Sequence, residues 1–119
     1  VYADPAMLRE VLANFVANEV KYNREKGRVS VSVREDGNKI EVRVRDTGVG
    51  IPKDQHGRVF AKFFRADNAV SQGFKGTGLG LYTAKIILDQ MHGQIRFESE
   101  LGKGTTFWIS FPRDQREKI

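Results

Sequence analysis

The chain has 119 residues, of which 39% are hydrophobic, enough for one domain with its own core. It contains no cysteine, which excludes disulfides, thiolate catalysis and cysteine-based metal sites, and the composition fits a reducing, cytoplasmic setting. The formal net charge of +5 suits an anionic ligand, although the Lys and Arg residues are scattered as on an ordinary solvated surface.

The first predicted element is an amphipathic helix from residue 5 to about residue 23. Asp4 provides a capping acceptor, and Pro5 suits the first helical position. Apolar residues then recur with a helical period at Leu8, Val11, Leu12, Phe15, Val16 and Tyr22. The preceding start, VYADP, resembles the middle of a longer protein, so we expect an excised domain.

An antiparallel hairpin is predicted next. Valines alternate with polar residues in RVSVSVRE (28–35), and apolar residues alternate in KIEVRVRD (39–46). The turn DGN joins the two predicted strands.

A glycine-rich loop, TGVGIPKD, follows Asp46, and a short helix is predicted over 53–60. Segment 65–77 is polar and without periodicity, which predicts a mobile loop. A second amphipathic helix is predicted over 79–91.

A second hairpin closes the chain, with strands QIRFESE and TTFWISF joined by the turn LGKG. The order of elements predicts an α+β fold: a two-layer α/β sandwich with helices on one face of a mixed, mainly antiparallel sheet.

Glycines alternate at Gly76, Gly78 and Gly80 just ahead of the second long helix, which suggests close approach of the backbone to a ligand. A Walker loop is excluded, because GKGT at 102–105 lacks the upstream glycine spacing. A dinucleotide fingerprint is excluded too, because the spacing is GxGxG and the preceding segment is a loop. No HExxH pattern occurs, so no protein-only metal site is predicted.

Five segments taken together carry a family resemblance: NFVANEVKYN (14–23), DTGVGI (46–51), VFAKFFRAD (59–67), GTGLGL (76–81) and GKGTTF (102–107). Their order and spacing resemble the ATP-binding catalytic domain of two-component sensor histidine kinases. The wider superfamily also holds the ATPase domains of DNA gyrase, Hsp90 and MutL, and shares the Bergerat-type ATP-binding fold. The resemblance covers about residues 2–112.

The first helix carries polar residues with helical spacing, at Asn14, Asn18, Lys21 and Tyr22. The resemblance implies that Asn18 coordinates Mg²⁺ on the ATP phosphates with assistance from Asn14. It also implies that Lys21 neutralises phosphate charge and that Tyr22 packs near the nucleotide. Magnesium suits this role because it takes few protein ligands and keeps water and phosphate oxygens.

Asp46 is implied to read adenine, because a carboxylate accepts a hydrogen bond from the exocyclic amine, which guanine does not offer at that position. A buried polar match of this kind discriminates strongly between bases. Gly48 and Gly50 would let the loop bend close to the base, with Ile51 beside it.

The resemblance makes segment 65–77 the ATP lid. Phosphate and nucleotide contacts are implied for Lys75, Gly76, Thr77, Gly78, Leu79, Gly80 and Leu81. Phe60, Phe63 and Phe64 resemble the aromatic box that anchors the lid, with ordinary core packing as the alternative. Arg65 would contact phosphate or a partner domain, and Thr105 belongs to the last family segment, which is also a good plain hairpin turn.

The expected function is binding of Mg-ATP and transfer of its γ-phosphoryl group to a histidine on a separate helical dimerisation domain, with Asn14, Lys21 and Lys75 in the catalytic roles. Neither His56 nor His92 has the helical setting of such an acceptor histidine. The isolated chain should therefore show little or no autophosphorylation. A response regulator receiver domain would be the further partner of the parent protein, and the isolated domain should be a monomer.

Two alternatives remain from the sequence. One is an ATP-hydrolysing conformational switch, although such proteins usually hold a catalytic Glu where Asn14 stands. The other is a docking domain without kinase activity, which Glu19 keeps open because the family has a small residue there. Nucleic-acid binding is not expected, since the aromatic residues are not interleaved with a basic stripe.

Overall fold

The computed structural model of the protein describes residues 5–21, 23, 26–71, 73 and 79–112. Its elements follow the chain in the order α1 (Pro5–Lys21), β1 (Val29–Asp36), β2 (Lys39–Asp46), the 3-10 helix η1 (Lys53–Arg58), α2 (Asp67–Ser71), α3 (Gly80–Gln90), β3 (Gln94–Glu100) and β4 (Gly104–Pro112). None of the helices in these ranges is long and apolar enough to cross a membrane.

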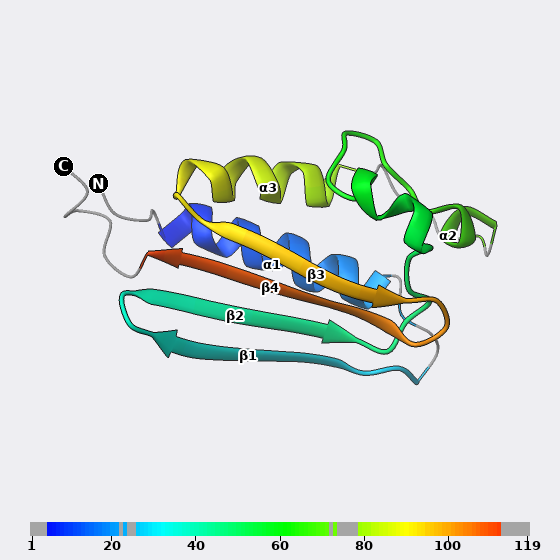
Figure 1. Cartoon of the computed structure of the whole chain (residues 1–119), viewed down its shortest axis with the longest axis horizontal. Helices are drawn as coiled ribbons and strands as arrows, with labels where there is room; N and C mark the ends of the chain where they lie inside the picture. The colour runs from blue at the N-terminus through cyan, green and yellow to red at the C-terminus, as the bar shows by residue number, and fades with distance from the viewer. Residues whose placement is uncertain (1–4, 22, 24–25, 72, 74–78, 113–119) are drawn as a thin grey trace.

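The four strands form one sheet in the order β1-β2-β4-β3, and the three pairings described are all antiparallel. Both predicted hairpins are present as β1–β2 and β3–β4. The pairing of β2 with β4 joins the hairpins into a continuous sheet. Figure 1 shows α1 and α3 side by side over one face of this sheet, which confirms the predicted two-layer sandwich.

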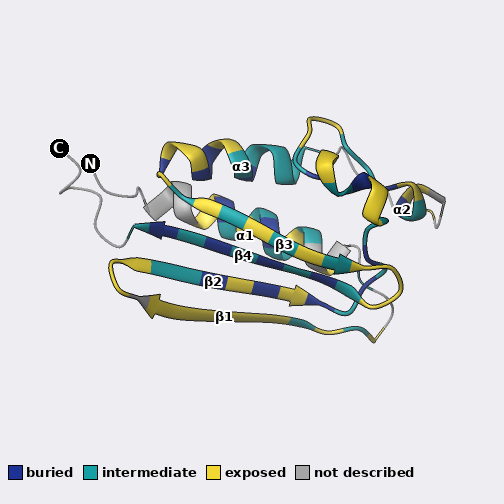
Figure 2. Ribbon diagram, in the orientation of Figure 1, coloured by how far each residue is buried: buried dark blue, intermediate teal, exposed yellow. Residues whose placement is uncertain are grey.

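The core lies between the two helices and the two central strands, because apolar residues from each layer face one another there. Phe107 on β4 is fully buried, and its ring centroid lies 5.1 Å from that of Phe15 on α1 and 5.6 Å from that of Phe97 on β3. Figure 2 shows buried residues recurring along β4, whereas the edge strand β1 is exposed along most of its length. Packing in the core therefore holds the central strands β2 and β4 in position. Asp46 lies at the end of β2, and Thr105 lies near the start of β4.

Segment 65–77 differs from the structureless loop that its sequence predicts, because it contains the five-residue helix α2. Two reciprocal hydrogen bonds stabilise the start of α2: Gln55 Nε2 donates to Asp67 Oδ2 at 2.7 Å, and the Asp67 N–H donates to Gln55 Oε1 at 3.1 Å. Ala66 and Ala69 are buried at its base. A helix this short is not stable alone, so its stability comes from these tertiary contacts.

The end of α3 is a strained position occupied by His92. Its backbone has φ of 58°, in the left-handed region, and the next N–H, that of Gly93, donates to the carbonyl of Leu88 at 2.8 Å. Glycine is the preferred residue at this point of a helix terminus because it has no Cβ penalty.

We therefore expect His92→Gly to raise the free energy of unfolding by about 0.5–1 kcal/mol. Urea denaturation would measure the change. His92→Ala is the matched control, since it removes the exposed imidazole but keeps the strain, and it should give little or no gain. A stabilisation by alanine equal to that by glycine would contradict this explanation.

Candidate functional site

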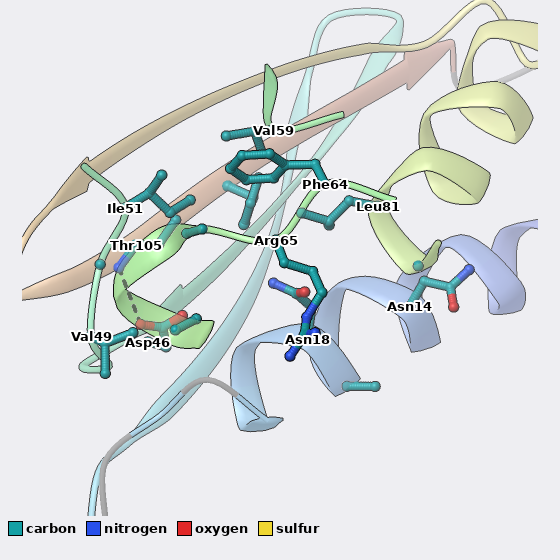
Figure 3. Close-up of a pocket in the computed structure, with 16 residues that line it drawn as sticks. Asn14, Asn18, Asp46, Val49, Ile51, Val59, Phe64, Arg65, Leu81 and Thr105 are labelled. Carbon is teal, nitrogen blue, oxygen red and sulfur yellow. Dashed lines mark hydrogen bonds between the residues drawn. The ribbon is translucent and has the colours of Figure 1, made fainter. Parts of the chain in front are cut away.

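A cavity of about 240 Å³ opens between α1, the end of β2, the glycine loop after it and the start of α3. Its lining includes predicted site residues from five separate segments: Asn14, Asn18, Asp46, Gly50, Ile51, Arg65, Gly80, Leu81 and Thr105. Figure 3 shows that the labelled lining residues come from α1, the sheet edge, the loops beside it and the start of α3. The cavity is thus formed where the five family segments meet, although they are far apart in the chain.

Asp46 is a buried carboxylate at the polar edge of this cavity, with 6% of its surface exposed. Its Oδ1 accepts hydrogen bonds from the N–H of Gly48 at 2.7 Å and from the N–H of Thr105 at 3.1 Å, the second drawn as a dashed line in Figure 3. Within the described part of the chain, Oδ2 takes no hydrogen bond. The carboxylate is therefore held in one orientation by one oxygen, and the other oxygen is available to a ligand.

The remaining walls are largely apolar. They include side chains that the sequence did not single out as ligand contacts: Val49, Val59, Phe107, Ala17, Ala66 and Ala69. Phe64, which was predicted to anchor the lid, also lines the cavity. An apolar cavity with few oriented polar groups is typical of a small-molecule site.

Asn14 and Asn18 occupy the same face of α1, one helical turn apart, and both are half-buried at the cavity. Their side-chain oxygens are hard donors of the type that Mg²⁺ accepts. No group of three or more His, Cys, Asp and Glu able to hold a metal occurs among the residues that the structure describes. The donor set here fits an ion that is bound mainly through ligand oxygens and water.

Hydrogen bonds hold the glycine loop, residues 47–54, to neighbouring segments on two sides. Asn68 of α2 donates from Nδ2 to the carbonyl of Gly50 at 2.9 Å. On the other side, the N–H of Gly102 donates to the carbonyl of Val49 at 3.0 Å, and the N–H of Ile51 donates to Ser99 Oγ at 2.8 Å. These contacts connect the glycine loop, which lines the cavity, to α2 and to the β3–β4 turn. The role of Ser99 in them was not predicted from the sequence.

Four predicted contacts are not among the residues that line the cavity. Phe63 does not line the cavity: it is 61% exposed, with φ of 65° and the Lys62 ammonium 5.2 Å from its ring centroid. Phe60 packs in the core, 5.9 Å from Phe97 and 6.2 Å from Phe107 between ring centroids, as the core-packing alternative expected. Gly48 acts through its N–H on Asp46, and Leu79 precedes α3 at its N-cap.

The other predicted contacts fall outside what the structure describes. These are the side chain of Lys21 and residues Tyr22, Lys75, Gly76, Thr77 and Gly78, together with the side chain of Glu19.

Residues 3–115 match the family model described as Histidine kinase-, DNA gyrase B-, and HSP90-like ATPase. The chain is 43% identical over 112 residues to the sensor-like histidine kinase SenX3 of Mycolicibacterium smegmatis, covering 94% of this chain and 29% of that protein. It is 39% identical over 109 residues to the sensor histidine kinase RcsC of Escherichia coli, covering 92% of this chain and 11% of that protein. The chain thus spans less than a third of the length of these curated relatives.

Solved structures agree with the sequence relatives. The mycobacterial sensor histidine kinase MprB superposes with a TM-score of 0.84 at 29% identity, over 94% of this chain and 76% of that one. Full-length ShkA, solved in complex with AMPPNP, superposes with a TM-score of 0.77 at 34% identity, over 92% of this chain and 22% of that one. These matches confirm the fold predicted from the sequence.

Proposed function

The chain belongs to the histidine kinase-, DNA gyrase B- and HSP90-like ATPase family, and from that premise we propose that it binds Mg-ATP in the cavity at Asp46. We further propose that, within a longer sensor kinase, it transfers the γ-phosphoryl group to a histidine on a separate helical dimerisation domain. A receiver domain would then take the phosphoryl group from that histidine.

The observation that carries the proposal is the oriented carboxylate of Asp46. With Oδ1 occupied by two backbone N–H groups, Oδ2 is the acceptor left for a ligand. The exocyclic amine of adenine is a donor of the required kind, whereas guanine presents an acceptor oxygen at the same position. The apolar walls that include Val49, Ile51 and Leu81 would pack against the faces of the base.

The volume of the cavity supports binding of part of the nucleotide rather than all of it. About 240 Å³ lies below the roughly 300–1,000 Å³ of sites that enclose whole drug-sized ligands. The base would occupy the enclosed part, and the phosphates would lie at its open side. Gly80 lines the cavity at the start of α3, so the positive end of that helix is available to anionic groups.

Asn18 and Asn14 would hold the magnesium ion, because their amide oxygens are suitable donors at the cavity wall. The chemical contribution of the ion, when bound, is to neutralise charge on the phosphate oxygens. Lys21, Lys75 and the glycines at 76 and 78 would add phosphate contacts, and Arg65, which lines the cavity, would contact a phosphate or the partner domain.

Phosphoryl transfer from this site would depend on positioning and charge stabilisation. An imidazole nitrogen of the acceptor attacks the γ-phosphorus, the bond to the β,γ-bridging oxygen breaks, and ADP leaves with that electron pair. The imidazole proton passes to solvent, so the domain itself needs no general base.

The two histidines of this chain make contacts typical of structural residues and not of a phosphoryl acceptor. The His56 ring nitrogen Nε2 lies 3.0 Å from the carbonyl oxygen of Ile51, and its ring packs edge-on against Phe97 at 5.0 Å. His92 terminates α3. The acceptor is therefore proposed to come from another domain.

A mixing experiment tests the function. The chain is combined with a helical dimerisation domain carrying an acceptor histidine, γ-labelled ATP and Mg²⁺, and we expect label on the acceptor only when both proteins are present. Asn18→Ala should slow transfer by about 100-fold or more, since charge stabilisation around a metal supplies several kcal/mol of the rate enhancement. Asn38→Ala, in the exposed β1–β2 turn, is the matched control and should leave transfer unchanged.

Two other results would replace this proposal. Release of free phosphate without phosphohistidine would indicate an ATP-hydrolysing switch module of the same family. Neither product, with a folded chain, would indicate a docking domain.

A further inference from the structure

Ser99 on β3 lies just outside the cavity, yet it contacts three groups that shape the cavity edge. Its Oγ accepts the N–H of Ile51 at 2.8 Å, lies 3.2 Å from the carbonyl oxygen of Gly104, and lies 2.7 Å from Thr105 Oγ1. Ile51 and Thr105 both line the cavity, whereas Ser99 does not. Any influence of Ser99 on a ligand therefore acts through these two residues.

The donor and acceptor capacity of a hydroxyl group restricts this arrangement. Ser99 Oγ has one hydrogen to donate and two lone pairs to accept with. The N–H of Ile51 uses one lone pair, and the carbonyl of Gly104 can only accept, so the 3.2 Å contact is a hydrogen bond in which Ser99 donates its hydrogen to Gly104. Either hydroxyl could donate in the 2.7 Å contact between Ser99 and Thr105, but all three contacts are hydrogen bonds at once only when the Thr105 hydroxyl donates to the second lone pair of Ser99.

The direction of that hydrogen bond has a consequence for the cavity. Thr105 lines the cavity, and when its hydroxyl donates to Ser99, only lone pairs of that oxygen are left for a ligand. Its backbone N–H is also occupied, by Asp46 Oδ1. The polar edge formed by Asp46 and Thr105 then consists of acceptors alone.

We infer that Ser99 is a positioning residue for base selectivity: by making Thr105 an acceptor, it tunes the cavity edge for a 6-aminopurine and against a 6-oxopurine. This inference rests on the proposed ATP-binding function and adds to it the residue that sets the polarity of the edge. In this arrangement the amine of a 6-aminopurine would have Asp46 Oδ2 and the Thr105 hydroxyl oxygen as acceptors, whereas a 6-oxo group would face lone pairs without a donor.

Binding of Mg-ATP and Mg-ITP, measured by calorimetric titration, tests the inference because the two nucleotides differ at the purine 6-position. The wild-type chain should bind ATP more tightly than ITP. In Ser99→Ala the Thr105 hydroxyl is free to turn and donate into the cavity. The ratio of ATP affinity to ITP affinity should therefore fall by about tenfold. Most of the change should be weaker ATP binding.

Matched variants separate polarity from a general structural effect. Ser99→Thr keeps a hydroxyl and should restore most of the selectivity. Thr105→Val removes the hydroxyl at similar volume, should lower the ratio as Ser99→Ala does, and remains informative if Ser99→Ala fails to fold. Adding Ser99→Ala to Thr105→Val should lower the ratio little further. Ser32→Ala, on exposed β1, should change neither affinity.

Several outcomes would overturn the inference. One is an equal loss of ATP and ITP affinity in Ser99→Ala at an unchanged ratio, which would indicate a purely structural role. Others are an unchanged ratio in Thr105→Val, or a Ser99→Thr variant that behaves like alanine. Failure of the wild-type chain to bind either nucleotide would instead refute the proposed function itself.

Discussion

Asp46→Asn is expected to weaken Mg-ATP binding by about 100-fold while leaving the fold intact. Asparagine is nearly isosteric, so its carbonyl oxygen can replace Oδ1 as the acceptor for the N–H groups of Gly48 and Thr105. Its amide nitrogen then takes the place of Oδ2 at the cavity. An amine of adenine would face a donor instead of a charged acceptor.

The size of this effect follows from the hydrogen bond that is lost and from the mismatch that replaces it. Hydrogen bonds to charged groups contribute about 1.5–3 kcal/mol, and about 2.7 kcal/mol corresponds to a hundredfold change in affinity. Calorimetric titration measures the dissociation constant, and thermal unfolding reports whether the fold is kept. A dissociation constant unchanged from wild type would refute the assignment of Asp46 as the reader of the base.

Two further variants isolate the cause. Asp54→Asn makes the same change in net charge on the exposed first turn of η1 and should leave ATP binding unchanged. Asp46→Ala removes both oxygens, so it should lose ATP binding and also stability, because each buried N–H left unpaired costs about 1–3 kcal/mol. Loss of binding in Asp54→Asn as well would point to long-range charge instead of a specific contact.

Gly50→Ala is expected to lower the free energy of unfolding by about 3–4 kcal/mol. Gly50 has φ of 73°, and a Cβ built there would lie 2.2 Å from the carbonyl oxygen of Glu100 and 3.0 Å from Leu101 Cα. The left-handed backbone alone costs an alanine about 1–2 kcal/mol. The rest arises because the clash is with backbone, so the β3–β4 turn must move.

Gly37→Ala is the matched control for this substitution. Gly37 has φ of 62°, almost the same backbone conformation, but a Cβ there meets nothing within 4 Å. Its cost should therefore be the conformational part alone, about 1–2 kcal/mol. Urea denaturation of both variants measures the difference, which is the energetic cost of separating the glycine loop from the β3–β4 turn. Equal losses of unfolding free energy in the two variants would show that the close approach of Gly50 to the β3–β4 turn is unimportant.

The Gly50 variant also connects stability with the site. Gly50 accepts the hydrogen bond of Asn68, and Ile51 next to it is held by Ser99. Displacing the loop would therefore disturb the cavity wall as well as the turn. We expect weaker ATP binding in Gly50→Ala and none of this loss in Gly37→Ala.

Much of the fold could be predicted locally. Alternating apolar residues over 28–35 and 39–46 predicted β1 and β2, because a strand with one buried face repeats every second residue. The helical period predicted α1 and α3 to within about two residues at each end. The family was also recognisable, because its five segments combine residue types and spacings that are read without knowing the fold.

Other features depended on contacts between distant segments. The helix α2 escaped prediction because it is stabilised by Gln55, twelve residues away from Asp67. Phe63 was grouped with Phe60 and Phe64 by their resemblance to the aromatic box of the family, but a backbone φ of 65° and 61% exposure separate it from them. Ser99 resembles any small polar residue of an alternating strand, so nothing in its local sequence marks it.

The sequence by itself determined the strands, the two long helices, the family and the residue types available for the site. The tertiary structure decided which of those residues meet. Pairing of β2 with β4 sets Arg45 opposite Thr106, which brings the neighbouring Asp46 and Thr105 within 3.1 Å between the Thr105 N–H and Asp46 Oδ1. The physical reason is that local propensity acts over a few residues, whereas strand register and hydroxyl direction are set by packing and hydrogen bonds between segments tens of residues apart.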